Sequence, residues 1–348
     1  MIISIAPPFL ELPKLQKAAH PNPDKILSTH SRLTITPETD FWEVWENGPQ
    51  NESYSELSRC MVTLGKTFCQ MVKLGQGNVK VSQKTSPQDL VTEMDRGIEM
   101  LLRLWIKKFY PHHKIVGEEG YKESFKTTDC VWYIDPVDGT SNFVEGNERV
   151  AMHVGCFGHG KTVFSMVGIP IQERLYFTHC DDPHTYHWNY QTEDPKPVQA
   201  PAWKALVAIG TEYMDSRKKE ASLAVRLTQK LLMPHHRVKS IGINVLDMIE
   251  KEHTVFYRNR IKLWDIMAPL GVLAPLASGK LKIELGIPSS GTILTAKNCQ
   301  WVSPFSNDEH LVHWINNRHK LNSRVGLILV YPVDRPDFKM VLTKAIFS

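Results

Sequence analysis

Residues 131–143 read Val-Trp-Tyr-Ile-Asp-Pro-Val-Asp-Gly-Thr-Ser-Asn-Phe, and the interpretation of the whole chain starts from this stretch. The apolar run at 131–134 predicts a strand in a packed sheet, because it is short and ends at turn residues. Pro136 fixes the backbone just past the strand, so the carboxylates of Asp135 and Asp138 can converge instead of alternating across a sheet. The stretch therefore predicts a strand that ends in a pair of neighbouring carboxylates.

Gly139 and Thr140 follow this turn and offer backbone N–H groups, which suit a phosphate group. Taken alone, a D-P-x-D-G turn can also be an ordinary Asx turn that caps a helix. Glu118 and Asp265 favour a functional site over a simple cap, because each also follows a short apolar run, as Asp135 does. Hard divalent cations bind several oxygen ligands, and carboxylates that share a site repel one another unless a cation neutralises them. The acidic residues together favour a divalent metal site.

Outward from this stretch, hydrophobic periodicity predicts helices over 54–75 and 95–109. Strands are predicted at 150–157, 161–169, 175–178 and 205–209, and a strand at 237–241 follows a predicted helix at 217–232. The last forty residues contain a helix-like piece at 311–315 and strand-like pieces at 325–331 and 339–342. Prolines between 192 and 201 mark an internal boundary. We expect an N-terminal extension packed on the surface (1–53), an α+β lobe (54–195), a smaller α/β lobe (196–305) and a C-terminal extension (306–348), with regular structure starting at Tyr54.

Composition excludes several classes of protein. The 348 residues carry a net charge of +4, too weak and dispersed to indicate binding to nucleic acid or to an anionic membrane. The chain has no uninterrupted apolar stretch of about 18 residues, so we expect no membrane span, and its N-terminus does not resemble a signal peptide. Six cysteines without a C-x-x-C pair favour reduced thiols in a cytoplasmic protein.

Four motifs in order resemble the inositol monophosphatase family of lithium-sensitive, magnesium-dependent phosphatases. The family signature D-P-[ILV]-D-G-T-[ST]-N-F matches residues 135–143 without a mismatch, and its W-D signature matches residues 264–269. A G-E-E block matches residues 117–119, and K-x-S-P-x-D-L-V-T-x-x-D matches residues 84–95. The resemblance covers about residues 54–305. It implies an α+β fold, a layered α/β/α/β/α sandwich of the sugar-phosphatase type with the active site between two lobes.

The resemblance also implies roles for individual residues. Two or three Mg²⁺ ions would be held by Glu118, Asp135, the Val137 carbonyl, Asp138 and Asp265. Asp95 and Thr140, with Glu118, would be catalytic, because they would orient a metal-bound water for attack on phosphorus. The phosphate and the rest of the substrate would contact Asp138, Gly139, Thr140, Ser141, Arg258 and Asp265. Glu119 and Lys84 would lie farther out.

Arg258 departs from the family pattern, because members usually carry a carboxylate seven residues before the W-D aspartate. A guanidinium binds phosphate or carboxylate in a bidentate manner, so this position favours an anionic group on the substrate, unless Arg258 is a surface residue of a shifted loop. The G-[ST]-A segment of the polyol pocket is replaced by residues 242–244, Gly-Ile-Asn. The specificity pocket is therefore not that of a typical inositol phosphatase.

We predict a cytoplasmic phosphoric monoester hydrolase, sensitive to lithium, that acts on a small sugar or polyol phosphate. Fructose 1,6-bisphosphate and 3′-phosphoadenosine 5′-phosphate are alternative substrates, both favoured if Arg258 reaches the pocket. A catalytically silent binding or scaffold relative is the alternative from another class, although the complete acidic set argues against it. The expected partner is a small phosphate ester, with no nucleic acid or membrane, and a homodimer is the habit of the family.

Overall fold

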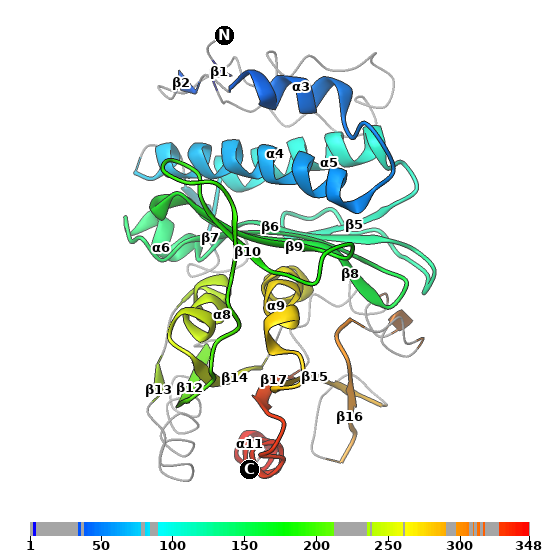
Figure 1. Ribbon diagram of the computed structural model, residues 1–348, viewed down its shortest axis with the longest axis vertical. Helices are drawn as coiled ribbons and strands as arrows, with labels where there is room; N and C mark the ends of the chain where they lie inside the picture. Colours follow the sequence, from blue (N-terminus) through cyan, green and yellow to red (C-terminus); the bar gives the residue numbers. More distant parts are fainter. Residues whose placement is uncertain are drawn as a thin grey trace.

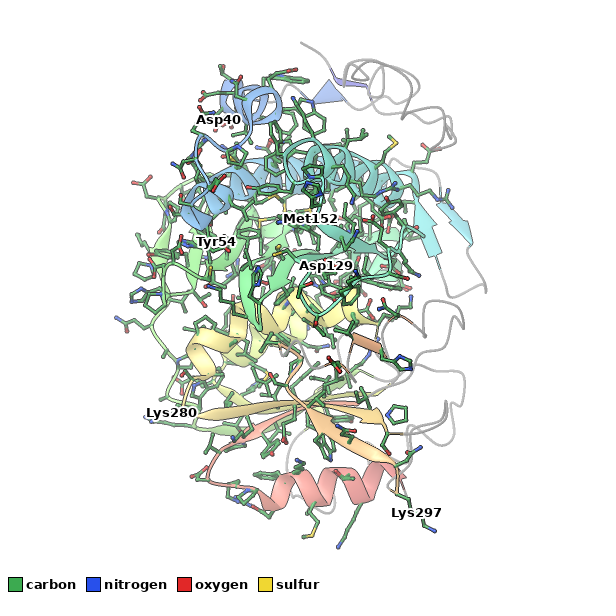
Figure 2. All side chains as sticks on the ribbon, turned by 90° about the vertical axis from the view of Figure 1, so that its right-hand side faces the viewer. Asp40, Tyr54, Asp129, Met152, Lys280 and Lys297 are labelled. Atoms are coloured by element: carbon green, nitrogen blue, oxygen red, sulfur yellow. The ribbon has the colours of Figure 1, made fainter. Side chains whose placement is uncertain are left out.

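The computed structural model describes residues 3–4, 34–35, 38–77, 81–83, 90–211, 235–236, 239–259, 262–289, 297–305, 309, 312–313, 316 and 327–347. Layers of helix, sheet, helix, sheet and helix follow one another from the top to the bottom of Figure 1. The layered α/β/α/β/α sandwich implied by the resemblance is thereby confirmed. Side chains fill the space between the layers, as Figure 2 shows around Met152, which is fully buried.

The first sheet has seven strands in the order β11-β10-β9-β8-β7-β6-β5. The strands are β5 (Lys114–Gly117), β6 (Val131–Asp138), β7 (Ala151–Gly158), β8 (Lys161–Ile169), β9 (Arg174–His179), β10 (Tyr186–Asn189) and β11 (Lys196–Pro197). All neighbours pair antiparallel except β5 and β6, which are parallel. The strands predicted at 150–157, 161–169 and 175–178 are confirmed within one residue at each end. A short 3₁₀ helix, η1 (Pro170–Gln172), joins β8 to β9.

Two long helices, α4 (Tyr54–Gly75) and α5 (Glu93–Phe109), cover one face of this sheet. Both confirm the sequence prediction, because each buries the apolar face that its periodicity marks. The Ser53 hydroxyl caps α4 by accepting the N–H of Glu56. Thr92 and Asp95 form a capping box at the start of α5.

The opposite face is covered by α8 (Ile241–Glu250) and α9 (Leu263–Ala277), which separate the first sheet from the second. The second sheet has the order β13-β12-β14-β17-β15-β16. Its strands are β12 (Ala205–Thr211), β13 (His235–His236), β14 (His253–Asn259), β15 (Leu281–Pro288), β16 (Cys299–Val302) and β17 (Leu327–Pro332). Helix α11 (Asp337–Phe347) packs against β17 on the outer side.

The remaining elements of the described residues are short. They are β1 (Ile3–Ser4), β2 (Thr34–Ile35), α3 (Thr39–Asn47), β3 (Val81–Gln83), β4 (Leu90–Thr92) and α6 (Thr140–Val144). None of the helices in the described part of the chain has both the length and the apolar character of a membrane span. All six cysteines are free thiols.

The prediction that regular structure starts at Tyr54 is wrong. Helix α3 precedes α4 and packs on it, with Phe41, Val44 and Trp45 buried. These three residues lie at three-, four- and one-residue steps on one helix face, and Phe41 stacks on Trp45 with ring centroids 5.9 Å apart. The spacing of Phe41, Val44 and Trp45 was therefore a signal for a helix, but a pattern that spans only five residues is too short to identify a helix by itself.

The strand predicted at 339–342 is wrong, and the described residues of the strand predicted at 237–241 do not form a strand. Residues 339–342 belong to α11, and a short apolar run does not distinguish a buried helix from a strand. Ile241 is the first residue of α8 and not the last of a strand, because the Ser240 hydroxyl caps the helix by accepting the N–H of Ile243. The predicted helix at 217–232 lies outside the described residues. At 311–315, Val312 and His313 are helical and the neighbouring positions lie outside the described residues.

The strand order of the second sheet indicates which residues belong to the smaller lobe. Strand β17 lies between β14 and β15, although it comes from the segment expected to be a C-terminal extension. Its apolar run, residues 327–332, supplies the antiparallel partner of both neighbours. Since β11 ends at Pro197 and β12 begins at Ala205, we propose that the lobes join within residues 198–204, and that the smaller lobe includes β17.

Candidate metal centre

Three carboxylates converge where the first sheet faces α9. One oxygen from each of Glu118, Asp135 and Asp265 lies within 4.8 Å of the other two, and this is the one such group of ligand atoms found among the described residues. Asp135 and Asp265 are buried, with 2% and 9% of their surface exposed, and Glu118 is half-buried. The convergence that the sequence predicted for these three residues is therefore present in the fold.

The topology explains why residues so far apart in sequence meet. Strands β5 and β6 are parallel neighbours, so their carboxyl ends reach the same edge of the sheet. Gly117 pairs with Ile134, and the N–H of Glu118 donates to the Ile134 carbonyl at 3.0 Å, which places Glu118 beside Asp135. Asp265 reaches the same point from the first turn of α9.

The environment of these carboxylates opposes their ionisation in the absence of a cation. Burial raises the pKa of Asp135 well above its usual value, and the neighbouring charges of Glu118, Asp138 and Asp265 raise it further. Burial also raises the pKa of Asp265 to about 6, although the nearby ammonium of Lys262 opposes this shift. A divalent cation among the three carboxylates would remove this cost.

A bulge separates Asp138 from this group. Asp135 pairs with His153 on β7, whereas Asp138 pairs with Ala151, so β6 contains one extra residue between the two pairs. Asp138 Oδ2 accepts the Ser240 hydroxyl at 2.6 Å and the N–H of Gly242 at 2.7 Å. The carboxylate of Asp138 is thus held by the start of α8, and it adjoins the three converging carboxylates without belonging to their group.

Thr140 connects the bulge to α5. Its hydroxyl lies 3.1 Å from the Val137 carbonyl and 3.4 Å from Asp95 Oδ1, and it can donate to either. Asp95 is fully buried, and its other oxygen accepts the N–H of Thr92 at 2.9 Å and the Thr92 hydroxyl. The Asp95–Thr140 pair expected from the resemblance is therefore brought together, and the capping box of α5 fixes its orientation.

The turn after Asp138 has the conformation that a glycine allows. Gly139 has a φ of 88°, and a Cβ on it would lie 3.1 Å from the Arg149 carbonyl oxygen, so both backbone conformation and space favour glycine here. Thr140 and Ser141 then open the short helix α6. The three predicted phosphate-binding positions thus follow one another in a tight turn next to the carboxylates.

Arg258 lies on β14 with 7% of its surface exposed, so it is not a surface arginine. Its charge contributes to holding down the pKa of Asp265, which places it near the carboxylate group. Lys84 lies outside the described residues. The N–H of Glu119 donates to Glu99 Oε2 at 2.7 Å, which anchors the backbone beside Glu118.

Sequence reasoning missed several charged neighbours of the site. Lys262 Nζ lies 3.4 Å from Glu118 Oε1 and 5.3 Å from the ring centroid of Trp264, and Lys122 Nζ lies 4.2 Å from the same centroid. The position of Lys262, three residues before the W-D aspartate, was the signal that could have found it. No signal of this kind marks Lys122, which only the fold brings to Trp264.

His153 was also missed. It is fully buried on β7, with Nε2 3.3 Å from Asp138 Oδ2 and Nδ1 4.0 Å from Asp135 Oδ2. A Cβ on Gly242 would lie 2.4 Å from His153 Nε2, so the imidazole fills the space that this glycine leaves. A histidine inside an otherwise apolar strand was the available signal.

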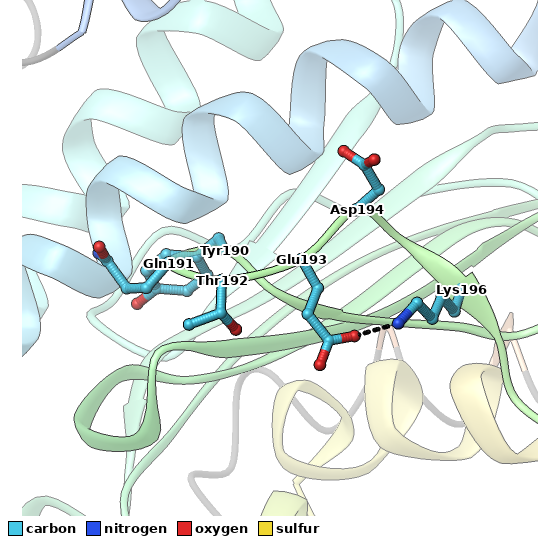
Figure 3. A pocket seen from close by; sticks show the side chains of 6 residues that line it. All are labelled: Tyr190, Gln191, Thr192, Glu193, Asp194 and Lys196. Atoms are coloured by element: carbon cyan, nitrogen blue, oxygen red, sulfur yellow. Dashed lines mark hydrogen bonds and ion pairs between the residues drawn. The ribbon is translucent and has the colours of Figure 1, made fainter.

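A hollow of about 480 Å³ lies elsewhere on the surface (Figure 3). It is lined by Tyr190, Gln191, Thr192, Glu193, Asp194 and Lys196. Five of these residues form the connection between β10 and β11, and Lys196 begins β11, at the edge of the first sheet opposite β5. Their charges include the exposed Glu193–Lys196 ion pair. This hollow shares no residue with the carboxylate group.

Comparison with known proteins agrees with the motifs and the fold. The model of the inositol monophosphatase family matches residues 53–313. Inositol monophosphatase 1 of Sus scrofa is 29% identical over 252 residues, which span 68% of this chain and 87% of the relative. An IMPase of Thermotoga maritima has a similar fold, with a TM-score of 0.58 and 19% identity over 82% of this chain and 96% of that one. An IMPase/NADP phosphatase solved with Mg²⁺ and phosphate has a TM-score of 0.58 and 17% identity over 84% and 95%. The chain belongs to the inositol monophosphatase family of phosphoric monoester hydrolases.

Proposed function

We propose that this protein is a Mg²⁺-dependent phosphomonoesterase that hydrolyses a small sugar or polyol phosphate. The observation that carries the proposal is the convergence of Glu118, Asp135 and Asp265 in a mostly buried group. The Mg²⁺ and phosphate bound in the structurally similar IMPase/NADP phosphatase support the choice of metal and of the group that is recognised.

The donor set fits a hard divalent cation. It offers carboxylate oxygens from three different elements, and their mutual repulsion raises the pKa of Asp135 unless positive charge is supplied. We propose that Glu118, Asp135, the Val137 carbonyl, Asp138 and Asp265 hold two or three Mg²⁺ ions. When bound, Mg²⁺ would act as a Lewis acid, making water more acidic and stabilising the developing negative charge.

Asp95 and Thr140 would orient the attacking water. The Thr140 hydroxyl carries one proton, which it donates toward Asp95 Oδ1 or the Val137 carbonyl, so its lone pairs remain able to accept a hydrogen bond from water. Buried Asp95 is held by Thr92 and would set the direction of that hydroxyl. Glu118 would act on the same water as the third catalytic residue.

The phosphate would be bound by the turn that follows Asp138. Gly139, Thr140 and Ser141 present successive backbone N–H groups there, and donors of this kind stabilise the phosphoryl oxygens as charge develops. The hydrogen bonds that Ser240 and Gly242 donate to Asp138 would keep this turn in place during the reaction.

The identity of the remainder of the substrate depends on Arg258. Its burial near Asp265, together with Lys262 and Lys122 around Trp264, favours a substrate with a second anionic group. This observation supports fructose 1,6-bisphosphate or 3′-phosphoadenosine 5′-phosphate as the second candidate, beside a singly phosphorylated polyol.

Phosphate release from a panel of esters tests the proposal. The panel holds inositol, glycerol and histidinol phosphates, fructose 1,6-bisphosphate and 3′-phosphoadenosine 5′-phosphate, each with Mg²⁺ and with EDTA. If Arg258 binds a second anion, Arg258→Glu should reduce kcat/KM for the bisphosphates by about 10²-fold or more, because a salt bridge is replaced by repulsion. The singly phosphorylated polyols should change much less.

Lys196→Glu, which reverses an exposed charge on the opposite edge of the sheet, is the matched control. Equal losses for all esters in Arg258→Glu would contradict a role for Arg258 in specificity. Mg²⁺ binding by the wild type without turnover of any phosphate ester would support the scaffold alternative instead.

The proposal also includes inhibition by Li⁺ and a homodimer, both carried over from the family resemblance, and a cytoplasmic location, which the cysteine usage favours. Measuring phosphate release against increasing LiCl, with NaCl at equal ionic strength as the control, tests the first. Light scattering coupled to size-exclusion chromatography tests the second. Fractionation of the cells that produce the protein tests the third.

A further inference from the structure

Two cysteines lie together at the end of β6 that is remote from the carboxylates. Cys130 immediately precedes β6, and Cys156 lies on β7 opposite Trp132. Residues 130 and 132 project to the same face of the sheet, so the two cysteine side chains are diagonal neighbours on that face, and each thiol changes the pKa of the other. Gly158 faces Cys130 across the strands, and a Cβ on this glycine would lie 2.6 Å from Cys130 Sγ. The missing side chain of Gly158 provides the space that the sulfur occupies.

A hydrogen bond from Trp132 fixes the tautomer of His113, a neighbour of Cys130. Trp132 Nε1 lies 3.0 Å from His113 Nδ1, and an indole nitrogen can only donate. His113 Nδ1 is therefore the acceptor, and the proton of the neutral ring resides on Nε2. Tyr110 stacks on the other side of the ring at a centroid distance of 4.9 Å. His113 lies close enough to Cys130 to lower the pKa of its thiol, and Nε2 is the ring nitrogen that carries the donor.

These contacts make the two thiols chemically unequal. The neighbouring Cys156 thiol and, next, His113 lower the pKa of Cys130 to about 4, against the effect of burial. Burial raises the pKa of Cys156 well above its usual value. Cys130 is also partly exposed, whereas Cys156 is fully buried. The arrangement therefore places a reactive thiolate at the surface and a protonated thiol directly behind it.

We propose that Cys130 is a site of oxidation by hydroperoxides, and that Cys156 converts the oxidised product into a disulfide. The Cys130 thiolate sulfur attacks one oxygen of hydrogen peroxide, the O–O bond breaks, and hydroxide leaves, which gives a sulfenic acid and reduces the peroxide. The Cys156 sulfur then attacks the Cys130 sulfur and the S–O bond breaks. The leaving hydroxide and the Cys156 proton form water.

Two features separate this pair from other sites. Among the described residues, no third ligand atom joins the two sulfurs in a compact group, so a metal is not the expected occupant. Four residues of β6 lie between Cys130 and Asp135, and these five residue steps span about 17 Å of extended chain. Oxidation is thus independent of the proposed hydrolysis.

Peptide mapping of the full-length protein tests the proposal. The protein is treated with hydrogen peroxide, remaining thiols are alkylated, and the unreduced digest is analysed by mass spectrometry. We expect a peptide that links Cys130 to Cys156, and a rate of Cys130 oxidation at least about tenfold above that of half-buried Cys299 in the same sample. In Cys156→Ser the link should be lost and a sulfenic acid on Cys130 should be trapped by dimedone.

Cys180→Ser is the matched control, because Cys180 is a nearby thiol whose charge also acts on Cys156. It should leave the Cys130–Cys156 link unchanged. Oxidation of Cys130 no faster than that of Cys299, or a disulfide from Cys156 to Cys180 in place of the predicted one, would overturn the proposal. If Cys156→Ser has a lowered melting temperature, the wild type alone is the test: a peptide that links Cys130 to Cys156 supports the proposal, and its absence overturns it.

Discussion

Among single residues, Lys262 places a positive charge beside the metal centre. Its ammonium lies 3.4 Å from Glu118 and opposes the rise in the pKa of Asp265. We expect Lys262→Met to lower the Mg²⁺ concentration for half-maximal phosphate release by about threefold to tenfold, because a fixed cation no longer competes for Glu118. The measurement belongs at pH 8, where protons compete little with the metal.

Lys280→Met removes an exposed ammonium elsewhere and should leave this Mg²⁺ concentration unchanged. A higher Mg²⁺ requirement in Lys262→Met would mean that the lysine assists the metal centre instead of competing with the ion.

The residues of the site differ in how far the sequence could reveal them. Asp135 and Asp138 stand in one motif, but β6 continues through Pro136 to Asp138, and the chain turns only at Gly139. Their separation by a bulge was not predictable, because the pairing with His153 and Ala151 depends on a second strand. His153 reads as part of an apolar strand, and the pairing of β7 with β6, which no local pattern encodes, brings it to both aspartates.

At the scale of elements, the start of α8 holds Asp138 by packing tightly against β7. A Cβ on Gly242 would lie 2.4 Å from His153 Nε2 and 2.7 Å from the Ala151 side chain. We expect Gly242→Ala to destabilise the fold by about 1–3 kcal/mol, because the helix or the imidazole must shift. The same shift should reduce kcat by displacing the N–H that binds Asp138.

Thermal melting and steady-state kinetics of the same preparation check both effects. Lys251→Ala, just after the exposed end of α8, is the control and should change neither. An unchanged kcat despite a lowered melting temperature would show that this contact serves stability alone.

Elements were predictable where periodicity extends over several turns. Helices α4 and α5 each present a long apolar face with a capping residue at the start, so the sequence determines them locally. Helices α3 and α11 were missed because each is short and depends on a neighbour, α4 for the first and β17 for the second. The insertion of β17 between β14 and β15 involves residues far apart in sequence, and no local pattern encodes such a pairing.

For the whole molecule, the carboxylate group couples stability to pH and to metal. The folded-state pKa of Asp265, about 6, lies above the usual value of 3.8, so the folded protein binds the extra proton. Without metal, the resulting stability is fully present below about pH 4 and is lost as pH rises through 6. For Asp265 alone the change is on the order of 3 kcal/mol, and the raised pKa of Asp135 acts in the same direction.

Melting temperatures of the EDTA-treated protein across this pH range, compared with those of Asp265→Asn, isolate the effect. The wild type should lose stability relative to the variant between pH 4 and pH 6, and Mg²⁺ should restore more of it at pH 7 than at pH 5. Parallel profiles for the two proteins would contradict a raised pKa.

The central claim is that Asp135, between Glu118 and Asp265, holds the catalytic metal. Mg²⁺-dependent phosphate release by the wild type and by Asp135→Asn, on the best ester of the panel, tests it most directly. Asp194→Asn, an exposed carboxylate on the opposite edge of the sheet, is the matched control. We predict that release falls by at least about 10³-fold in Asp135→Asn and is unchanged in Asp194→Asn. Metal-dependent release that survives in Asp135→Asn would contradict the assignment of the metal centre.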